Sequence, residues 1–394
     1  MTIQLLKTAI MNISFFSNFL NIHQSPFCEE MIKLVGVGNF HFVATTKMDA
    51  NRVEMGFENM NETKPYVIRA YNGKQEWNEA LQLARDSDVV IFGSAPVEFC
   101  DERMKLNKLT FRYNERLLKK AYWRALDPRM IKMVYHKFSK YRNKNLYVLC
   151  ASAYTKSDIG LYGFPRDKCY KWGYFPVIPS FENYKELEKE KKQARLDKKA
   201  SLLWVARLVK LKHPELPVLM AKELKKEGYS FHLTMIGSGE LENELKQMIV
   251  RDGLSECISL VGSLPHEQVI NEMKKSDIFL FTSSRHEGWG AVMNEAMSCG
   301  CAVVANREIG SVPFLVQNKV NGMIYNKNSL NQLIRCVKEL LDTPTSIHKY
   351  SIAAYETIVN KWNVTEASKR FVNLISSINN DLNTPYEDGP CSKA

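Results

Sequence analysis

Strand-like apolar runs alternate with helix-like segments along almost the whole chain, and this alternation limits the fold more than any other feature. The runs in the first half are "NISFFSNF", "FHFVATT", "YVIRA", "DVVIFGS" and "LYVLCAS". Those in the second half are "SLLWVARL", "FHLTMIGSG", "ISLVG", "DIFLFTSS" and "CAVVAN". Because apolar strands connected through helices are typical of parallel sheets, the sequence predicts an α/β fold.

One local repeat indicates two similar domains. The segments "ARDSDVVIFGSAP" (84–96) and "MKKSDIFLFTSSR" (273–285) share a helix end, an aspartate, a buried strand and a loop of small residues. We interpret them as equivalent strands of two doubly wound, Rossmann-like domains, for which 394 residues are sufficient. The expected organisation is a first domain at 1–180, a polar linker at 181–200, a second domain at 201–360, a last amphipathic helix at 361–380 that can return to the first domain, and a disordered tail at 381–394.

The composition is that of a soluble globular protein, with 45% hydrophobic and 25% charged residues. No apolar run approaches the roughly 20 residues of a membrane-spanning helix. We interpret residues 12–20 as a first strand rather than part of a signal peptide, and the sequence leaves open whether Met1 or Met11 is the natural start. The nine cysteines show neither metal-binding spacing nor a disulfide framework, which favours reduced thiols, a cytoplasmic location and no metal site.

A basic segment accounts for the formal net charge of +11. Between Arg103 and Lys144, a long series of Lys and Arg is opposed only by Glu115 and Asp127, and aromatic residues are interleaved with it. Such a segment could contact nucleic acid, an anionic membrane surface or a phosphorylated substrate. The alternative is a solvated helical face.

The segment "SSRHEGWGAVMNEAMSCGCAVVA" (283–305) places two carboxylates around a glycine-rich bend, where a strand is followed by a helix. Ligands of open α/β sheets bind beyond the carboxyl ends of the strands, which is where Glu287 is expected. Gly288 and Gly290 allow a ligand to approach backbone amides at the helix start, and these favour a diphosphate. The carboxylates of Glu287 and Glu295 suit hydroxyl groups, those of a ribose in the second case. A diol, a diphosphate and a polyol together make a nucleotide-sugar.

The stretch "EGWGAVMNEA" resembles the E-x7-E motif of family 4 retaining glycosyltransferases, which have the GT-B fold. The resemblance implies two Rossmann-like domains facing across a cleft. It also implies that Glu287 contacts hydroxyls of the donor sugar and Glu295 contacts the ribose. The segment "VARLVKLKHPE" (205–215) is similar to the one whose Arg and Lys bind the donor diphosphate in this family, here Arg207 and Lys212.

Two further segments extend the resemblance over about 201–325. "IGSGE" (236–240) is similar to the family's GxG turn, and "LVGSLPHEQV" (260–269) is similar to the segment that lines the nucleobase. Ala206 replaces the glycine that is usual before the arginine. The resemblance assigns catalytic roles to Arg207, Lys212 and Glu287, and donor contacts to Gly237, Gly262, Ser263, Leu264, Gly288, Trp289, Gly290, Ala291 and Glu295.

In the first half, "FFSNFLNIHQSPFCEEM" (15–31) resembles the opening of a bacterial subgroup that builds surface polysaccharides. The segments "KLTFRYNERLLKK" (108–120) and "KCYKWGYFP" (168–176) resemble the same subgroup. Many family members carry a catalytic-site histidine after a later strand, whereas "IFGSAPVEF" (91–99) contains none. The candidates for the acceptor side of the cleft are His23, Gln24, Ser94 and His286.

Structural alternatives exist for these assignments. Glu287 could be a helix-capping acid and Glu295 a solvent-exposed acid on a helix. The two could also form a glycosidase pair, with carboxylates about 5–9.5 Å apart. Arg207 and Lys212 could be ordinary surface charges. His23 could be a core histidine whose hydrogen bonds are made within the protein, and His286 could point away from the site. Gly237 could be needed only for the geometry of its turn, without binding phosphate.

The residues and the resemblance together predict a retaining, metal-independent glycosyltransferase of the hexosyltransferase type (EC 2.4.1.-). It would need no cofactor and would take a nucleotide-sugar as co-substrate. The acceptor would be a saccharide, preferably lipid-linked, in the biosynthesis of a surface polysaccharide such as capsule, O-antigen or lipopolysaccharide. Segment 103–144 would rest on an anionic membrane surface, at the inner face of the cytoplasmic membrane. A GT-B-fold nucleotide-sugar epimerase and, less favoured, a basic nucleic-acid-binding protein are the alternatives.

Overall fold

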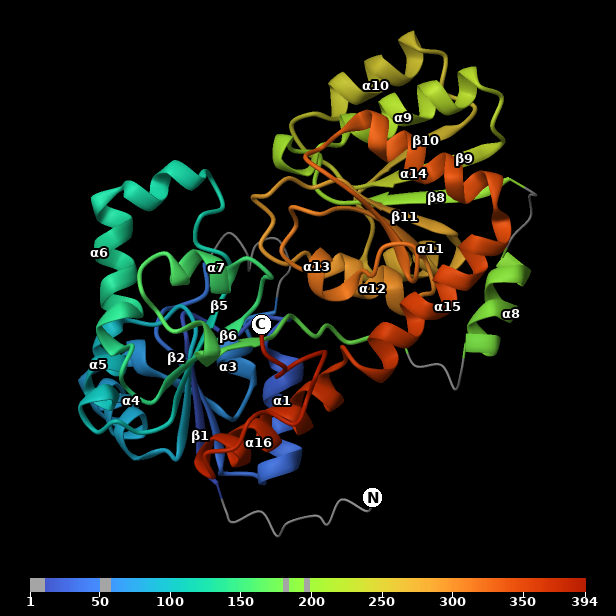
Figure 1. Ribbon diagram of the computed structural model, residues 1–394. Helices are drawn as coiled ribbons and strands as arrows, with labels where there is room; N and C mark the ends of the chain where they lie inside the picture. The colour runs from blue at the N-terminus through green and yellow to red at the C-terminus, as the bar shows by residue number, and fades with distance from the viewer. Residues whose placement is uncertain (1–10, 50–57, 180–183, 195–198) are drawn as a thin grey trace. The chain divides into compact units, whose positions relative to one another are not determined.

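The computed structural model describes residues 11–49, 58–179, 184–194 and 199–394 (Figure 1). It contains two compact units, Met1–Phe175 with Val364–Ala394, and Pro176–Asn363. Each unit is built on one parallel sheet, so the predicted α/β fold with two Rossmann-like domains is confirmed. The question of the natural start falls on residues outside the described ranges, as do the two ends of the expected linker.

The first unit has a seven-stranded sheet with the order β3-β2-β1-β4-β5-β6-β7. Five of these strands coincide with the apolar runs of the first half. Strands β5 and β7 were not expected, because "TFRYN" and "CYK" are short and contain charged residues. The strands are β1 Ile13–Ser17, β2 Phe40–Ala44, β3 Val67–Arg69, β4 Val89–Phe92, β5 Thr110–Asn114, β6 Leu146–Cys150 and β7 Cys169–Lys171.

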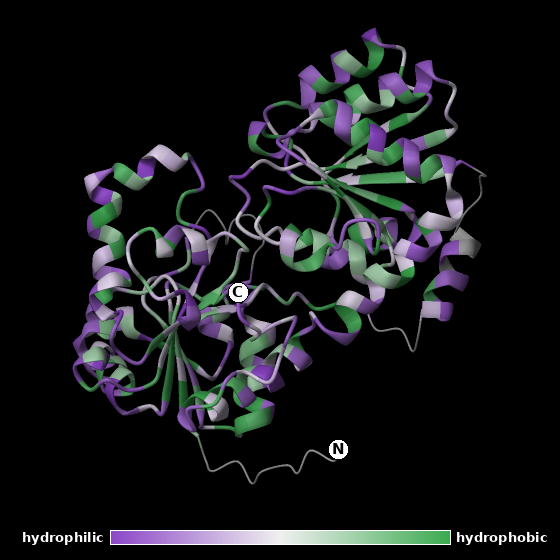
Figure 2. Cartoon of the chain, viewed as in Figure 1, coloured by the Kyte–Doolittle hydropathy of each residue, from purple (hydrophilic) through white to green (hydrophobic). Residues whose placement is uncertain are grey.

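Helices cover both faces of this sheet, which explains why its central strands β1 and β4 are buried along their whole length (Figure 2). Consecutive side chains of β1 point to opposite faces. Phe15 packs against Phe27 of helix α1, with ring centroids 6.3 Å apart, whereas Phe16 packs against Phe99 of helix α5 at 5.2 Å. The helices of the first unit are α1 Ser25–Val35, α3 Met60–Thr63, α4 Lys74–Asp86, α5 Val97–Lys105, α6 Pro128–Lys137, α7 Thr155–Gly160 and α16 Val364–Asn379.

The last residues of the chain are ordered against the edge strand β7. The Lys171 amide donates to the Ser392 carbonyl at 2.8 Å, and the Ala394 amide donates to the Cys169 carbonyl at 3.0 Å. Cys391 is fully buried. The structure therefore differs from the disordered tail expected at 381–394: backbone pairing orders a segment whose polar composition suggested disorder.

The second unit has a six-stranded sheet with the order β10-β9-β8-β11-β12-β13. Its strands are β8 Ala200–Val205, β9 Phe231–Ile236, β10 Ile258–Gly262, β11 Ile278–Phe281, β12 Ala302–Asn306 and β13 Gly322–Tyr325, of which only β13 was not expected. Helices α9, α10 and α14 cover one face, and α11, α12 and α15 cover the other (Figure 1). Their bounds are α9 Glu215–Lys226, α10 Glu242–Arg251, α11 His266–Lys275, α12 Val292–Ser298, α13 Val312–Leu315, α14 Leu330–Asp342 and α15 Pro344–Asn360.

The described part of the expected linker is a helix, α8 (Tyr184–Ala194), which packs against the second unit. Its Lys191 is only 8% exposed. The Lys191 ammonium donates to the carbonyl oxygens of Ser276 at 2.6 Å, Cys299 at 3.0 Å and Gly300 at 2.8 Å. These carbonyls follow the ends of α11 and α12, where a positive charge is favourable. Among the described residues, none of the helices combines the length and apolar composition that crossing a membrane requires.

Candidate functional site

The loops after β8 and β9 touch at the carboxyl edge of the second sheet. Gly237 has a φ of +142°, and a Cβ atom there would lie 1.8 Å from the Ala206 carbonyl oxygen. The Leu208 amide donates to the Ser238 carbonyl at 2.9 Å, which holds the two loops together. Gly237 is therefore required for this close approach, so the structural alternative for it is supported. A phosphate contact from Gly237 stays a proposal.

Lys212 and Glu287 meet at this edge. Lys212 ends the short helix η5 (Lys210–Lys212), and its ammonium donates to the Glu287 carboxylate. Each of these side chains is 15% exposed. Backbone contacts fix the pairing, because the Ser284 amide donates to the Leu211 carbonyl at 2.8 Å and the Thr282 hydroxyl donates to the Lys212 carbonyl at 2.7 Å. The sheet therefore brings together one expected cation and one expected carboxylate.

Arg207, the second expected cation, follows β8 and has an exposed side chain. Its guanidinium makes no ion pair with any residue that the structure describes. The structure thus does not join Arg207 to the Lys212–Glu287 pair, and leaves its positive charge available at the same edge of the sheet.

The bend between Glu287 and α12 is built on a glycine and a buried indole. Gly290 has a φ of +81°, and a Cβ atom there would lie 2.2 Å from the Phe281 ring. The Trp289 side chain is fully buried, donates to the Asn294 side-chain oxygen at 2.9 Å and packs 5.8 Å from the Trp362 ring. The indole therefore lies in the core, and a donor contact from the Trp289 backbone stays a prediction.

Helix α12 begins at Val292, after Gly288 and Ala291 have completed the bend. Gly288 is buried, whereas Ala291 is half-buried and is the residue that precedes the helix. Glu295 lies in the first turn of α12 and is 14% exposed. The bend thus ends close to the second expected carboxylate.

Glu295 is paired with His266, which was not among the predicted site residues. The His266 Nε2 atom lies 3.1 Å from the Glu295 Oε1 atom, and the histidine is 65% exposed. This hydrogen bond raises the pKa of His266 above its ordinary value. The only sequence signal for His266 was its position inside the segment expected to line the nucleobase.

The same segment contains Gly262, Ser263 and Leu264, which follow β10. The Gly262 carbonyl accepts a hydrogen bond of 2.8 Å from the Gly237 amide, and the Ser263 hydroxyl lies 2.7 Å from that of Ser238. Leu264 is half-buried. Through these contacts the loops after β8, β9 and β10 form one continuous edge.

His286 is exposed and has a local partner. Its Nδ1 atom lies 3.1 Å from the Ser284 hydroxyl oxygen, two residues earlier in the same loop. This geometry supports the alternative that the side chain serves the loop after β11. The structure gives it no contact with Glu287.

The three candidates of the first unit follow β1 and β4 at the carboxyl edge of its own sheet. The His23 ring stacks on the Tyr174 ring, with centroids 5.4 Å apart. Gln24 is 7% exposed, and its amide donates to the Ser17 hydroxyl at 3.4 Å, which gives it a structural role. Ser94 is exposed just after β4.

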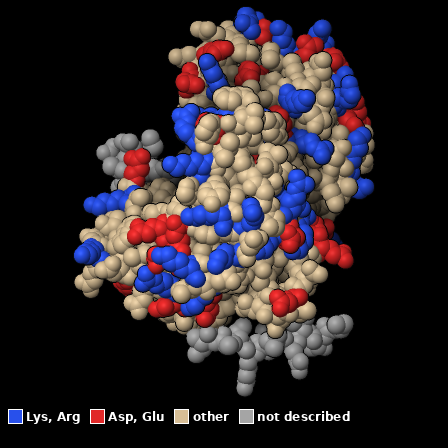
Figure 3. All heavy atoms as spheres, turned by 60° about the vertical axis from the view of Figure 1, so that its left-hand side comes forward, with Lys and Arg blue, Asp and Glu red and all other residues tan. Residues whose placement is uncertain are grey.

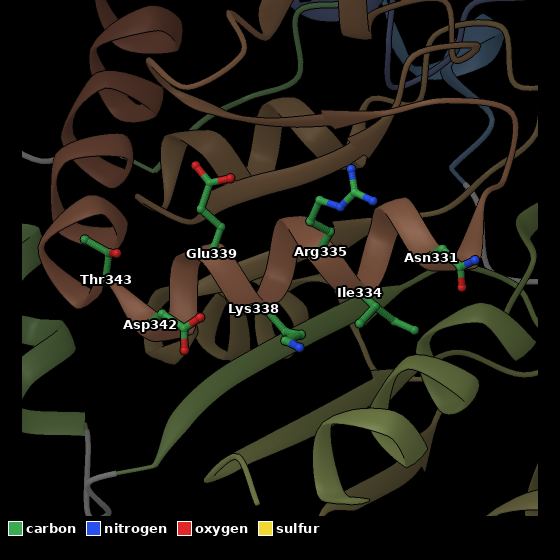
Figure 4. Close-up of a pocket in the computed structure, with 7 residues that line it drawn as sticks. All are labelled: Asn331, Ile334, Arg335, Lys338, Glu339, Asp342 and Thr343. Atoms are coloured by element: carbon green, nitrogen blue, oxygen red, sulfur yellow. The ribbon is translucent and has the colours of Figure 1, made fainter. Parts of the chain in front are cut away.

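A surface pocket of about 540 Å³ lies elsewhere in the second unit (Figure 4). Helix α14 runs along one face of the sheet, and the pocket contains none of the expected site residues. Among the described residues, no group of three or more His, Cys, Asp and Glu side chains could hold one metal ion. The pocket is lined by Asn331, Ile334, Arg335, Lys338, Glu339, Asp342 and Thr343.

Residues 185–357 match the family model of glycosyl transferases group 1. The amylovoran biosynthesis glycosyltransferase of Erwinia amylovora is 28% identical over 182 residues, which cover 45% of this chain and 44% of that protein. An uncharacterised glycosyltransferase of Methanocaldococcus jannaschii is 34% identical over 112 residues, which cover 28% of this chain and 31% of that protein. The chain thus spans less than half the length of these curated relatives.

Solved structures resemble both units. The Anabaena protein HepE in complex with UDP-glucose has a TM-score of 0.65 and 14% identity, covering 93% of this chain and 100% of its own. Sucrose-phosphate synthase from Thermosynechococcus elongatus has a TM-score of 0.63 and 16% identity, covering 94% of this chain and 100% of its own. At these identities the likeness shows the fold. The chain thus has the GT-B fold of these glycosyltransferases, and its second unit matches glycosyl transferases group 1.

Proposed function

We propose that this protein is a metal-independent, retaining hexosyltransferase that moves a sugar from a nucleotide-sugar to a saccharide acceptor. The observation that carries the proposal is the contact between Lys212 and Glu287, which lies at the carboxyl edge of the second sheet inside the matched segment. An ammonium group next to a carboxylate suits a ligand in which a phosphate adjoins a polyol.

The chemistry follows from where charge develops. When the sugar–phosphate bond breaks, negative charge grows on the leaving diphosphate, and Lys212 and Arg207 would stabilise it. These two cations supply the positive charge for which other enzymes use a metal ion. Glu287 would accept hydrogen bonds from the donor sugar, and Glu295 from the ribose, in place of its contact with His266.

Retention of configuration is proposed from the resemblance of residues 287–295 to the E-x7-E motif. A front-face route needs no protein nucleophile, because the leaving phosphate can take the proton of the attacking hydroxyl.

The relatives support a place in the biosynthesis of a surface polysaccharide. Besides the amylovoran enzyme, a putative colanic acid biosynthesis glycosyltransferase of Salmonella typhimurium is 25% identical over 184 residues. Both names refer to bacterial polysaccharides. We therefore propose a saccharide acceptor carried on a lipid, presented at the inner face of the cytoplasmic membrane. The complexes of HepE with UDP make UDP-sugars the first donors to test.

The surface proposed to face the membrane is smaller than the basic segment 103–144. Arg103, Arg112 and Arg116 are at most 3% exposed, so this part of the positive charge lies inside the first unit. On the face seen in Figure 3, basic and acidic side chains are mixed and separated by broad uncharged areas.

Most exposed large apolar side chains of the segment gather on the short helix η2 (Tyr122–Leu126) and on α6, which we call the η2–α6 patch. Trp123 is 71% exposed and Leu126 is 81% exposed. The basic residue Arg129 is 90% exposed beside them on α6. Exposed apolar side chains next to basic ones suit the interface of an anionic membrane.

Calorimetry with UDP-, GDP- and ADP-glucose, followed by mass analysis of products on lipid-linked saccharides, tests the proposed function. We expect one nucleotide-sugar to bind and its hexose to appear on an acceptor. Absence of binding by every nucleotide-sugar would contradict the proposal, and salt-sensitive binding of RNA or DNA in its place would favour the nucleic-acid alternative. Isomerisation of the donor without an acceptor would identify an epimerase.

A further inference from the structure

A cluster of polar and aromatic side chains lies at the carboxyl edge of the first sheet. Its members come from three segments that are far apart in the sequence: the end of β5 with the residues that follow it, and the loops after β1 and β7. All three lie in segments that resemble the bacterial polysaccharide subgroup (15–31, 108–120 and 168–176), but the resemblance gave no role to any residue of 108–120 or 168–176. We call it the Glu115 cluster, and it consists of His23, Tyr113, Glu115, Lys119 and Tyr174.

Glu115 is the centre of the cluster. It follows directly on Asn114, the last residue of β5. The Tyr174 hydroxyl donates to the Glu115 Oε1 atom at 2.7 Å, and the Lys119 ammonium donates to the Oε2 atom. Glu115 is 26% exposed, so its carboxylate is held in one orientation and is still accessible to solvent.

Aromatic rings hold the tyrosine in place. The Tyr174 ring stacks on His23, with an interplanar angle of 29°, and meets the edge of the Tyr113 ring at a centroid distance of 5.8 Å. Tyr174 itself is half-buried. The cluster therefore combines a fixed aromatic ring with a fixed carboxylate, both partly open to solvent.

This combination suits a sugar ring. A carboxylate has about four lone-pair positions, of which Tyr174 and Lys119 occupy one each, so further positions can accept hydrogen bonds from hydroxyl groups. The adjacent aromatic ring offers an apolar surface to the C–H groups of a pyranose. Because Lys119 balances the charge of Glu115, the cluster favours a neutral saccharide over an anionic ligand.

We propose that Glu115 and Tyr174 bind the acceptor saccharide: Glu115 accepts hydrogen bonds from its hydroxyl groups, and Tyr174 packs against its ring. The inference rests on the proposed function, which requires an acceptor. It also gives a polar group to the edge that lacks the expected histidine after β4, since β5 is the neighbour of β4 in the sheet. His23 acts as a positioning residue through its stack with Tyr174.

Saturation-transfer NMR of the full chain with the methyl glycosides of glucose, galactose and mannose tests this site. The variants are Glu115→Gln, which weakens the hydrogen-bond acceptor, and Tyr174→Phe, which keeps the ring but removes the hydroxyl. The control is Glu102→Gln on α5, a carboxylate of the same unit that pairs with Lys105 and Arg85. Thermal unfolding of each variant reports on folding, and calorimetry with UDP reports separately on the second unit.

We expect at least one glycoside to receive saturation from the parent chain and from Glu102→Gln. Glu115→Gln should weaken its binding by about tenfold or more, and Tyr174→Phe by less, with UDP affinity unchanged. The proposal is overturned if no glycoside binds, or if binding survives Glu115→Gln and is lost in Glu287→Gln. Loss of UDP binding in the parent chain would contradict the proposed function instead.

Discussion

At the scale of single residues, the contact between His266 and Glu295 links an exposed histidine to a carboxylate that the donor is proposed to need. Glu295 accepts a hydrogen bond from His266, and this raises the pKa of the histidine, which is therefore protonated at higher pH than a free histidine. When the pH falls through that raised pKa, the imidazolium pairs more strongly with Glu295 and competes with ribose hydroxyls.

We therefore predict that UDP-glucose binds more weakly at about pH 6 than at about pH 8. The expected change is about two- to fivefold, because a partly exposed ion pair contributes about 0.2–1 kcal/mol. The phosphate groups of UDP-glucose do not titrate in this range, so calorimetry at the two pH values reports on the protein. The change should disappear in His266→Gln, and an unaltered pH dependence in that variant would show that the histidine is not its source.

The exposed Arg207 leads to a second prediction. Arg207→Ala should lower the turnover number by about a hundredfold or more, since one lost donor to a developing anion typically costs about 2.7–4 kcal/mol. The melting temperature should stay the same because the guanidinium forms no ion pair among the described residues. Steady-state kinetics measures the effect. Lys246→Ala, which removes an exposed cation of α10 paired with Glu242, is the control and should leave turnover unchanged.

The proximity of Glu287 and Lys212 could be predicted from the sequence, because both follow strands of one parallel sheet and such strands end at the same edge. For Trp289 the sequence contained no sign that the indole packs in the core. A tryptophan in a glycine-rich bend resembles a ligand contact, yet its partner Trp362 comes from a helix end that the local sequence does not specify.

At the scale of elements, helix α8 shows that a polar composition alone does not distinguish a linker from a helix that packs against a domain. The segment is almost wholly polar, so it was interpreted as a linker. Its buried Lys191 binds three carbonyl oxygens that follow two helices of the second unit. Amphipathic patterning could not reveal this, because the buried group is charged and its partners are backbone atoms.

Lys191→Met should lower the free energy of unfolding of the second unit by about 2–3 kcal/mol, since it leaves buried carbonyl groups without a donor. Urea unfolding, followed by tryptophan fluorescence, measures this change. Lys189→Met, at an exposed position of the same helix, should change stability by less than about 0.5 kcal/mol. Equal effects of the two substitutions would mean that Lys191 does not fasten α8 to the unit.

The η2–α6 patch leads to a prediction about membranes. The parent chain should sediment with vesicles that contain anionic lipid, and salt should weaken this binding because each basic residue near the surface contributes about 1 kcal/mol. Trp123→Glu with Leu126→Glu should abolish it. Val37→Glu, at a 92% exposed apolar position of the same unit, is the control and should keep it. Retention of vesicle binding by the double variant would exclude this patch as the contact.

The strands that the sequence did not predict share one property. None of the strands β5, β7 and β13 forms a long apolar run, and β5 carries Arg112 within a basic segment. Arg112 is 3% exposed and packs 5.6 Å from the Phe138 ring centroid. A buried arginine on a strand looks like a surface residue in the sequence, because its neighbours, Phe92 of β4 and Phe138 after α6, come from other parts of the chain.

At the scale of the whole molecule, the alternation of apolar strands and helices was sufficient to predict two parallel sheets. It could not predict the pairing of the last residues with β7, because that pairing consists of backbone hydrogen bonds and leaves little trace in side-chain composition. The same distinction between local pattern and long-range contact applies to the candidate sites. The edge of the second sheet could be located from strand order and glycine positions, whereas the Glu115 cluster depends on tertiary contacts.

The central claim is that the carboxyl edge of the second sheet holds the donor. A crystal structure of the chain with the nucleotide-sugar selected by calorimetry tests it most directly. We predict the diphosphate within hydrogen-bonding distance of Lys212 and Arg207, and the ribose hydroxyls at Glu295, with the carboxylate released from His266. A nucleotide bound in the pocket along α14, or at the first sheet, with these side chains unoccupied, would contradict the account.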